Sequence, residues 1–542
     1  MVHGFAGMCN EIRVIGWLLA ALLTLLPSCV LAADCGTIVA EANNDISSFN
    51  PLYANALGNS RAAQLLFQPL IWVDRYGNVD LTHSLAAHIA ISPDTTTYTL
   101  TLRPWHWSDG APVTAADTLY TWRMIQSLGT AYPGYGSGGI PTLIKSITSP
   151  DPQHLQITLT GPVNPIWFID NGLSQITPLP AHAWSRLALD TLFQTQSEPG
   201  FFTVVDGPMR AQRLDVGMDA IFVPNPRYDG PKAHFHRLVL NFIHGDGAAL
   251  QQVEAGDLDF APVPMELLGA MHHLAGVHLE LLSPVSYFYY MGVNLQNPQV
   301  AFFRDVRVRQ AIQDALDQNA IIKLVYHGYG DAVYTPIPPV DANMLAPSLA
   351  KGEYPVGYNP ARARALLAAA GFTPGPDGIL QRHGQKLEFT ALMTSDSGEE
   401  AEMVVMMQAQ LRAIGINMQL HQTDFGQMMA TLQNEPQNWQ AAQLGTDLNP
   451  YPSGEGMFAT GAGENNGAYS DPEMDRLITA SIGTPGLAGL YAYEAYAAAQ
   501  QPVIFLPNEQ YSVLVRKGLY GIADFMNPLG AWAPEKLYCE AR

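Results

Sequence analysis

The sequence is poor in positive charge. Only 27 of its 542 residues are lysine or arginine, against 48 aspartates and glutamates, so the formal net charge is −21. A surface this acidic repels phosphate groups. The charge therefore argues against nucleic acids and anionic membranes as partners.

The familiar signatures of enzymes are also missing. No Gly-Lys dipeptide occurs, which excludes the usual phosphate-binding P-loop, and no His-Glu-x-x-His helix indicates a zinc protease. Gly136-Ser137-Gly138 lacks the first glycine of a G-x-S-x-G nucleophile elbow. His234 and His236 would share one face of a strand, but no third ligand follows them closely. We therefore expect neither catalytic activity nor a metal or cofactor.

Long apolar runs are absent except near the N-terminus. Val14–Leu26 is an apolar run of 13 residues, shorter than the about 20 that cross a bilayer as a helix. Small residues before Ala33 suit signal-peptidase cleavage, so residues 1–33 are predicted to be an export signal. The alternative is a lipoprotein signal in which Cys29 carries the lipid.

Removal of this signal leaves about 510 residues, too many for one ordinary domain. Helix and strand patterns interleave without an internal repeat, which indicates α/β lobes. Two cysteines then remain, Cys35 and Cys539, near the two ends of the mature chain. Because exported proteins form disulfides and compact domains often bring their ends together, a Cys35–Cys539 bridge is favoured over two free thiols.

The most informative local pattern runs from residue 84 to residue 123. Thr97–Leu102 alternates threonine with apolar residues, as a half-buried strand does. Trp105 and Trp107 flank His106 and predict a second, aromatic strand. Thr114 then suits a helix N-cap, because its hydroxyl can accept from a free backbone N–H. The segment reads as strand, turn, aromatic strand, turn and capped helix.

This segment resembles the signature of the extracytoplasmic solute-binding proteins of the peptide/nickel class, family 5. The matching residues, in the family's order, are Leu85-Ala86, Ser92-Pro93-Asp94, Leu102-Arg103, Trp107-Ser108-Asp109-Gly110, Pro112-Val113-Thr114-Ala115 and Asp117. Further blocks that resemble the family are Asn225-Pro226-Arg227-Tyr228, Gly256-Asp257-Leu258-Asp259, Phe303 to Ala311, Tyr358-Asn359-Pro360 and Tyr469-Ser470-Asp471-Pro472. Together they cover nearly the whole chain after residue 35.

The resemblance implies a multi-lobed α/β periplasmic binding protein, class II-like, with three lobes and a Venus-flytrap cleft. Lobe I is expected to be discontinuous, made of residues 34–77, 200–297 and 505–542. Lobe II would comprise residues 78–199 and lobe III residues 298–504.

The same resemblance implies the function: a monomeric, periplasmic receptor of an ABC importer. It would bind peptides between its lobes, without a cofactor, and deliver them to a permease in the inner membrane. One rival keeps the scaffold and changes the solute to a metal chelate, a haem, an opine or an oligosaccharide. The other rival, an exported hydrolase, requires a nucleophile–base pair that the sequence does not offer.

In the peptide-binding members, an aspartate anchors the α-amine of the ligand. The corresponding segment here is residues 444–452, in which Asp447 is the sole acid and Thr446 its neighbour. A gapless match instead puts Asn449 at the acid position. The alternative role for Asp447 is to cap a turn before Asn449-Pro450.

Other candidate ligand contacts come from three segments. Phe49 and Asn50 resemble an early loop of the family at a lobe boundary. Tyr287 and Tyr289 would point to one side of a strand and offer an aromatic platform, although core packing explains them equally well. Tyr135 lies in a glycine-rich loop that could reach a ligand.

Overall fold

The structure is a computed structural model. It describes residues 34–42, 45–74, 76–243, 246–263, 267–268, 275–282, 287–339, 343–394, 398–526 and 532–540. The predicted export signal, residues 1–33, and Cys29 with it lie outside the described residues.

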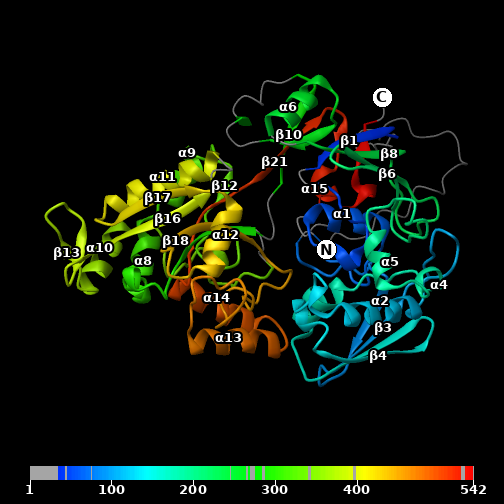
Figure 1. Ribbon diagram of the computed structural model, residues 1–542, viewed down its shortest axis with the longest axis horizontal. Coiled ribbons are helices and arrows are strands. Elements are labelled where there is room, and N and C mark those ends of the chain that lie inside the picture. The colour runs from blue at the N-terminus through cyan, green and yellow to red at the C-terminus, as the bar shows by residue number, and fades with distance from the viewer. Residues whose placement is uncertain are drawn as a thin grey trace, which may run out of the picture.

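The chain folds into two halves that lie side by side, each built around its own sheets (Figure 1). One half contains a seven-stranded and a four-stranded sheet, and the other contains a five-stranded sheet. This mixed α/β architecture with several sheets agrees with the predicted fold class.

The seven-stranded sheet collects strands from distant parts of the sequence. Its order is β10 (Val277–Leu282), β21 (Tyr511–Arg516), β9 (Phe260–Pro262), β1 (Thr37–Ala42), β8 (Arg237–Phe242), β7 (Asp219–Pro224) and β6 (Met209–Asp215). Strand β1 runs parallel to both of its neighbours, β8 and β9. The remaining neighbouring pairs, on either side of these three strands, are antiparallel. Both ends of the described chain therefore belong to this sheet region.

The four-stranded sheet is an antiparallel unit formed by neighbouring segments. Its order is β2 (Ala86–Ile91), β3 (Thr97–Leu102), β5 (His154–Leu159) and β4 (Ile144–Asp151). Tyr98, Leu100 and Leu102 are buried on one face of β3, which confirms the predicted half-buried strand. We refer to residues 86–194, which comprise this sheet and the helices within and after it, as the four-stranded lobe.

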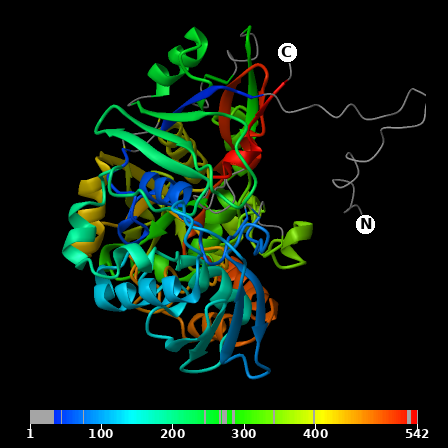
Figure 2. The same cartoon turned by 90° about the vertical axis from the view of Figure 1, so that its right-hand side faces the viewer.

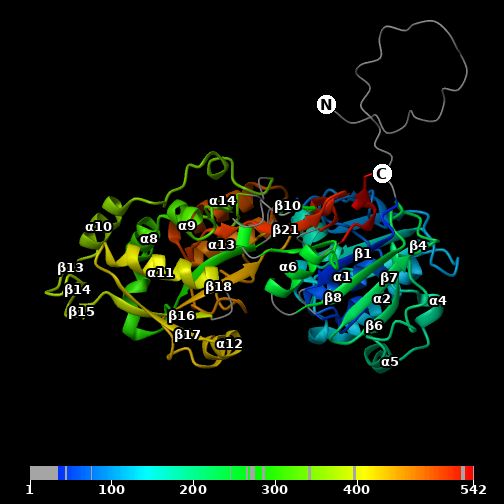
Figure 3. The same cartoon turned by 90° about the horizontal axis from the view of Figure 1, so that it is seen from above.

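The other half is built on the five-stranded sheet. Its order is β17 (Asn417–Thr423), β16 (Glu388–Thr394), β18 (Ala441–Asp447), β11 (Tyr287–Val293) and β19 (Ile504–Phe505). The chain passes into this half between β10 and β11 and returns between β20 (Asn508–Glu509) and β21, and β10 and β21 lie between the halves when seen from above (Figure 3). Because β11 pairs with β18, the chain enters this sheet ten residues before the lobe boundary expected at residue 297.

Small ladders complete the strands, at β12 (Gly330–Asp331) with β20, at β13 (Thr373–Pro374), β14 (Leu380–Arg382) and β15 (Gln385–Lys386), and at β22 (Leu519–Tyr520) with β23 (Tyr538–Cys539). The α-helices are α1 (Leu57–Leu66), α2 (Ala115–Leu128), α3 (Pro165–Trp167), α4 (Ala181–Trp184), α5 (Leu189–Gln194), α6 (Asp246–Ala255), α8 (Val306–Ala315), α9 (Gln318–Leu324), α10 (Pro360–Ala369), α11 (Gly398–Arg412), α12 (Phe425–Asn434), α13 (Pro472–Gly483), α14 (Ala488–Gln500) and α15 (Ile522–Phe525). Among the described residues, none of the helices combines the length and the apolar character that a bilayer crossing requires.

Shorter helical turns link these elements. They are η1 (Pro51–Tyr53), η2 (Gly129–Ala131), η3 (Ser137–Gly139), η4 (Phe168–Gly172), η5 (Leu173–Gln175), η7 (Pro298–Arg304), η8 (Leu349–Lys351) and η9 (Pro534–Lys536). The η4 turn is a π-helix, and together with α3 and η5 it forms one continuous segment of the four-stranded lobe.

The start of α2 has the predicted cap. The Thr114 backbone N–H donates to the Asp117 carboxylate at 2.8 Å, and the threonine side chain caps the first turn in return. The aromatic strand predicted at residues 105–107 is wrong, because His106 makes only an isolated bridge to Pro112. Instead, the indole N–H of Trp105 donates to the Asp206 carbonyl oxygen, and this contact ties the segment to the core.

The two ends of the chain are joined covalently. Cys35 and Cys539 form a disulfide with their Cα atoms 5.3 Å apart, across a sequence separation of 504 residues. Figure 2 shows the first strand in blue and the last strands in red together at one end of the molecule.

Candidate ligand-binding cleft

A cavity of about 550 Å³ opens where the two halves meet. Its lining residues are Ala54, Asn55, Ala56, Leu57, Ser60, Gln64, Pro69, Ile71, Trp72, Val73, Pro133, Ser174 and Gln175 from one half, and Asp447, Leu448, Asn449 and Pro450 from the other. The first set comes from η1, α1, the strand-like segment after α1, and two turns of the four-stranded lobe. The second set is the loop that leaves β18.

Asp447 is the last residue of β18 and is paired with Tyr287 of β11. Backbone pairing therefore fixes the point from which its side chain enters the cavity. Crowding by the cleft walls removes water from the carboxyl group and raises its pKa above the ordinary value of 3.8. Within the described part of the chain, no hydrogen bond or ion pair engages this carboxylate.

The described lining of the cavity carries one ionisable acid. Among the described lining residues, Asp447 is the sole charged side chain. Gln64, on α1, also lines the cavity, but its amide oxygen is shielded from solvent. The Asp447 carboxylate accepts hydrogen bonds and is negatively charged when ionised, so the cavity is suited to a cationic donor such as an ammonium group.

The lining from the half that contains α1 mixes apolar and polar side chains. Ile71 is buried and Trp72 is 8 % exposed, and both lie in the segment that follows α1. Ser174 and Gln175 add polar groups from η5. A cavity that combines apolar side chains with placed polar groups is typical of small-molecule sites.

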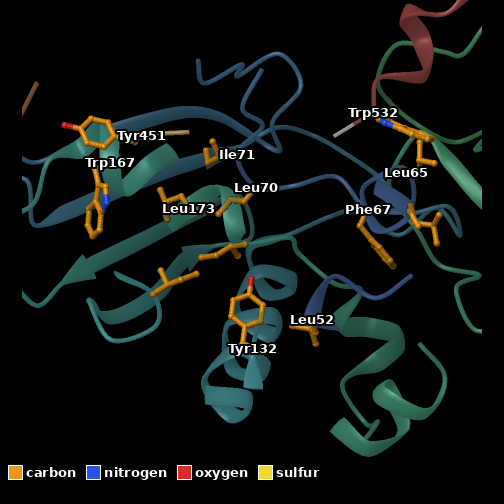
Figure 4. Packing of buried hydrophobic residues seen from close by; sticks show 14 of the residues in the cluster. Leu52, Leu65, Phe67, Leu70, Ile71, Tyr132, Trp167, Leu173, Tyr451 and Trp532 are labelled. Carbon is orange, nitrogen blue, oxygen red and sulfur yellow. The ribbon is translucent and has the colours of Figure 1, made fainter. Parts of the chain in front are cut away.

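The two halves also touch directly beside the cavity. The Tyr451 side chain, fully buried, lies in the same cluster of buried residues as Trp167 of the four-stranded lobe (Figure 4). The Trp167 indole N–H donates to the Glu455 carboxylate at 3.1 Å. These contacts close one side of the cleft.

The structure brings Asp447 and Asn449 into the same cavity. Both side chains are exposed to it, so the two alternative positions for the amine anchor lie two residues apart on one loop. Thr446 does not line the cavity, and its hydroxyl donates to the Glu464 carboxylate at 3.4 Å.

The predicted aromatic contacts lie outside the cavity lining. Tyr287 and Tyr289 pack edge to face with ring centroids 5.0 Å apart, and the Tyr289 hydroxyl donates to Glu509 at 3.3 Å. Tyr135 is 41 % exposed, whereas Pro133 of the same loop reaches the cavity.

Phe49 and Asn50 are buried in the core and are not among the cavity-lining residues. Phe49 packs edge to face against Phe202 and Phe222. The Asn50 side chain accepts a hydrogen bond from the Leu52 N–H at 3.0 Å and so caps η1. The early loop thus supports the cavity from behind.

The sequence analysis missed Gln64, Trp72, Ser174 and Gln175. No local pattern distinguishes them, because they reach the cavity only through tertiary packing. Helix α1 packs against β6, and the segment after it meets the four-stranded lobe, where the Leu70 N–H donates to the Ile176 carbonyl oxygen at 3.0 Å. A search for three clustered metal-ligating side chains finds none among the described residues.

Comparison with known proteins gives a family match. The family model of bacterial extracellular solute-binding proteins, family 5 Middle, matches residues 80–468. A curated relative, the oligopeptide-binding protein AppA of Bacillus subtilis, is 26 % identical over 455 residues, which cover 82 % of this chain and 80 % of the relative.

Solved structures agree on the fold. AppA from Bacillus subtilis in complex with a nonapeptide has a TM-score of 0.72 and 22 % identity, covering 94 % of this chain and 100 % of that one. NikZ from Campylobacter jejuni in complex with Ni(L-His) also has a TM-score of 0.72, with 23 % identity over 90 % of this chain and 95 % of that chain.

Proposed function

We propose, from the premise that this chain belongs to the bacterial extracellular solute-binding proteins of family 5, that it captures short peptides and hands them to an ABC permease. The peptide binds in the cavity between the halves, with its α-ammonium group on Asp447. The relatives named for oligopeptide binding support a peptide as the solute.

The proposal rests mainly on one observation: Asp447 is the sole charged side chain among the described residues that line the cavity. Asp447 enters the cavity from the end of strand β18. An ammonium group taken out of water needs such a partner, because an unpaired buried charge costs several kcal/mol, roughly. A cavity of about 550 Å³ lies in the range that encloses a ligand of a few residues.

Capture in this proposal is hinge closure of the halves around an extended solute. The hinge lies where the chain passes between the sheets, at β10–β11 and β20–β21. The proposed lobes are residues 34–77, 200–297 and 505–542 as the first body, residues 78–199 as the second and residues 298–504 as the third. We assign β11, β19 and β20 to the third body, because they pair with its strands.

The protein acts on its solute by binding alone and has no enzymatic step. It works as a monomer in the periplasm, reached through the export signal at residues 1–33, and its macromolecular partner is an inner-membrane permease. The family's role as an extracellular binding component supports this assignment.

Titration calorimetry with a panel of di- to pentapeptides tests the proposal. Saturable binding with a more compact bound state by small-angle scattering is the expected result. Native mass spectrometry of purified protein identifies any solute that is retained. A sugar, haem or metal chelate bound in the cavity, with no peptide affinity, would replace the peptide assignment.

A further inference from the structure

The loop that carries Asp447 is held at its far end by the opposite half of the molecule. We call residues 447–451 the arm. At its start, Asp447 is paired with Tyr287 in the five-stranded sheet. At its end, Tyr451 meets the α3–η4 segment of the four-stranded lobe.

The side-chain amide of Asn171 makes two hydrogen bonds to the main chain of Tyr451, one through its oxygen and one through its nitrogen; we call this pair of bonds the grip. The Tyr451 N–H donates to Asn171 Oδ1 at 2.9 Å, and Asn171 Nδ2 donates to the Tyr451 carbonyl oxygen at 2.9 Å. Both residues are fully buried. Such a paired contact fixes register as well as distance, because it satisfies one donor and one acceptor of the same residue.

Asn164 holds the same tyrosine differently. Its Nδ2 lies 3.0 Å from the Tyr451 hydroxyl, 3.0 Å from the Ser481 carbonyl oxygen and 2.8 Å from the Gly486 carbonyl oxygen. These contacts join the two halves, but they do not touch the main chain of the arm. Asn164 and Asn171 are therefore a matched pair of buried amides with different targets.

The cavity face of the arm lies between these two fixed ends. Asp447 to Pro450 all line the cavity, and they span only the distance from the end of β18 to Tyr451. Pro450 restricts the backbone dihedral angles just before Tyr451. A shift of Tyr451 along the four-stranded lobe would therefore move Asn449 and re-aim the Asp447 side chain.

We propose that Asn171 is a positioning residue for the ligand amine: its two hydrogen bonds to Tyr451 hold the arm, and with it the amine site, across the interface between the halves. This inference rests on the proposed function, in which Asp447 receives the ammonium group. It assigns recognition of the charged end of the solute to a residue that touches no solute and lies in the other half.

The test compares Asn171→Ala with Asn164→Ala, using a tripeptide and its N-acetylated form as ligands. Loss of Asn171 should reduce the preference for the free amine by about tenfold, as expected for one misplaced charged hydrogen bond. Loss of Asn164 should weaken both ligands by the same factor and leave the preference unchanged. Equal weakening of both ligands by Asn171→Ala overturns the positioning role.

Hydrogen exchange tests the grip without any peptide, so it separates this inference from the proposed function. In the wild-type protein, the Tyr451 amide should exchange slowly, and Asn171→Ala should accelerate exchange at Leu448, Asn449 and Tyr451 while β3 is unchanged. Fast exchange of Tyr451 in the wild-type protein, bound or free, overturns the inference even if the variant fails to fold. Absence of peptide binding with a slow Tyr451 amide would instead reject the proposed function alone.

Discussion

Asp447 and Tyr287 stand opposite one another in the β11–β18 ladder, where the first residue of one strand meets the last residue of the other. The sheet therefore fixes the backbone position of Asp447 on one side, and the arm that follows it sets the direction of the side chain from the other. Asn508 reinforces this position, because its side chain donates to the Tyr287 carbonyl oxygen at 2.6 Å and accepts from the Tyr289 N–H at 3.0 Å.

Asp447→Asn should weaken the binding of a free-amine tripeptide by about 10- to 100-fold, since a charge-assisted hydrogen bond in a cleft contributes about 1.5–3 kcal/mol. Its melting temperature should stay near that of the wild type, because no described residue bonds the carboxylate. Calorimetric titration measures the affinity. Asp257→Asn, which removes an exposed acid outside the cavity lining, is the matched control and should bind normally.

Peptide affinity should fall on acidification at a higher pH than an ordinary aspartate would cause. Burial raises the pKa of Asp447, so its carboxylate takes up a proton, and loses its attraction for an ammonium group, before an exposed aspartate does. Titrations in steps from pH 7 to about pH 4 follow the loss. In Asp447→Asn this acid limb should vanish; its persistence would point to another titrating group.

Asp170→Asn should make stability less dependent on pH. Burial, and then the nearby charge of Asp74, raise the pKa of Asp170 to about 8. The folded protein thus keeps a proton that the unfolded chain has lost, so stability is highest below the unfolded pKa and falls as pH rises toward the folded value. The slope is about 1.4 kcal/mol per pH unit in that window.

Urea unfolding of the wild type and Asp170→Asn at pH 5, 6.5 and 8 measures this slope. The variant should gain stability relative to the wild type as the pH increases. Parallel pH profiles for the two proteins would show that Asp170 ionises normally in the folded state. Asp257→Asn serves again as the control, since its exposed carboxylate should leave the profile unchanged.

Removal of the disulfide should destabilise the protein without affecting the cavity. The Cys35–Cys539 bridge closes a loop across 504 residues, for which the chain-entropy model gives about 6 kcal/mol. A Cys35→Ser/Cys539→Ser double variant should therefore unfold at lower urea concentration than the oxidised wild type. Neither cysteine lines the cavity, so its peptide affinity should be unchanged; a large loss of affinity would contradict this separation.

Local patterns were good predictors where local chemistry decides. The alternation at Thr97–Leu102 became β3, and the Thr114–Asp117 pair became the cap of α2. The two tryptophans at 105 and 107 misled, because the backbone here pairs only across its own tight turn. The Trp107 N–H donates to the Ala111 carbonyl oxygen and the Val113 N–H to the Trp105 carbonyl oxygen, which makes an isolated bridge and no strand.

Of the residues that line the cavity, the sequence predicted those of the loop around Asp447 but not those of the other half. Asp447 follows the apolar end of β18 and is the sole acid of its segment, so its sequence context marks it. The sequence around Gln64 and Trp72 has no such feature, because these residues become cavity walls only when α1 packs against β6 and the segment after α1 meets the four-stranded lobe. The reverse holds for Phe49, which follows a polar stretch in the sequence yet lies between two phenylalanines in the core.

The disulfide between the two ends of the chain has a practical consequence for the choice of a site at which to attach a tag. Cys35 and Cys539 anchor both termini on the half that contains the seven-stranded sheet. A surface tether or a fused reporter at the C-terminus would therefore be attached to that half alone. Because the proposed capture moves one half relative to the other, attachment to a single half should leave solute capture intact.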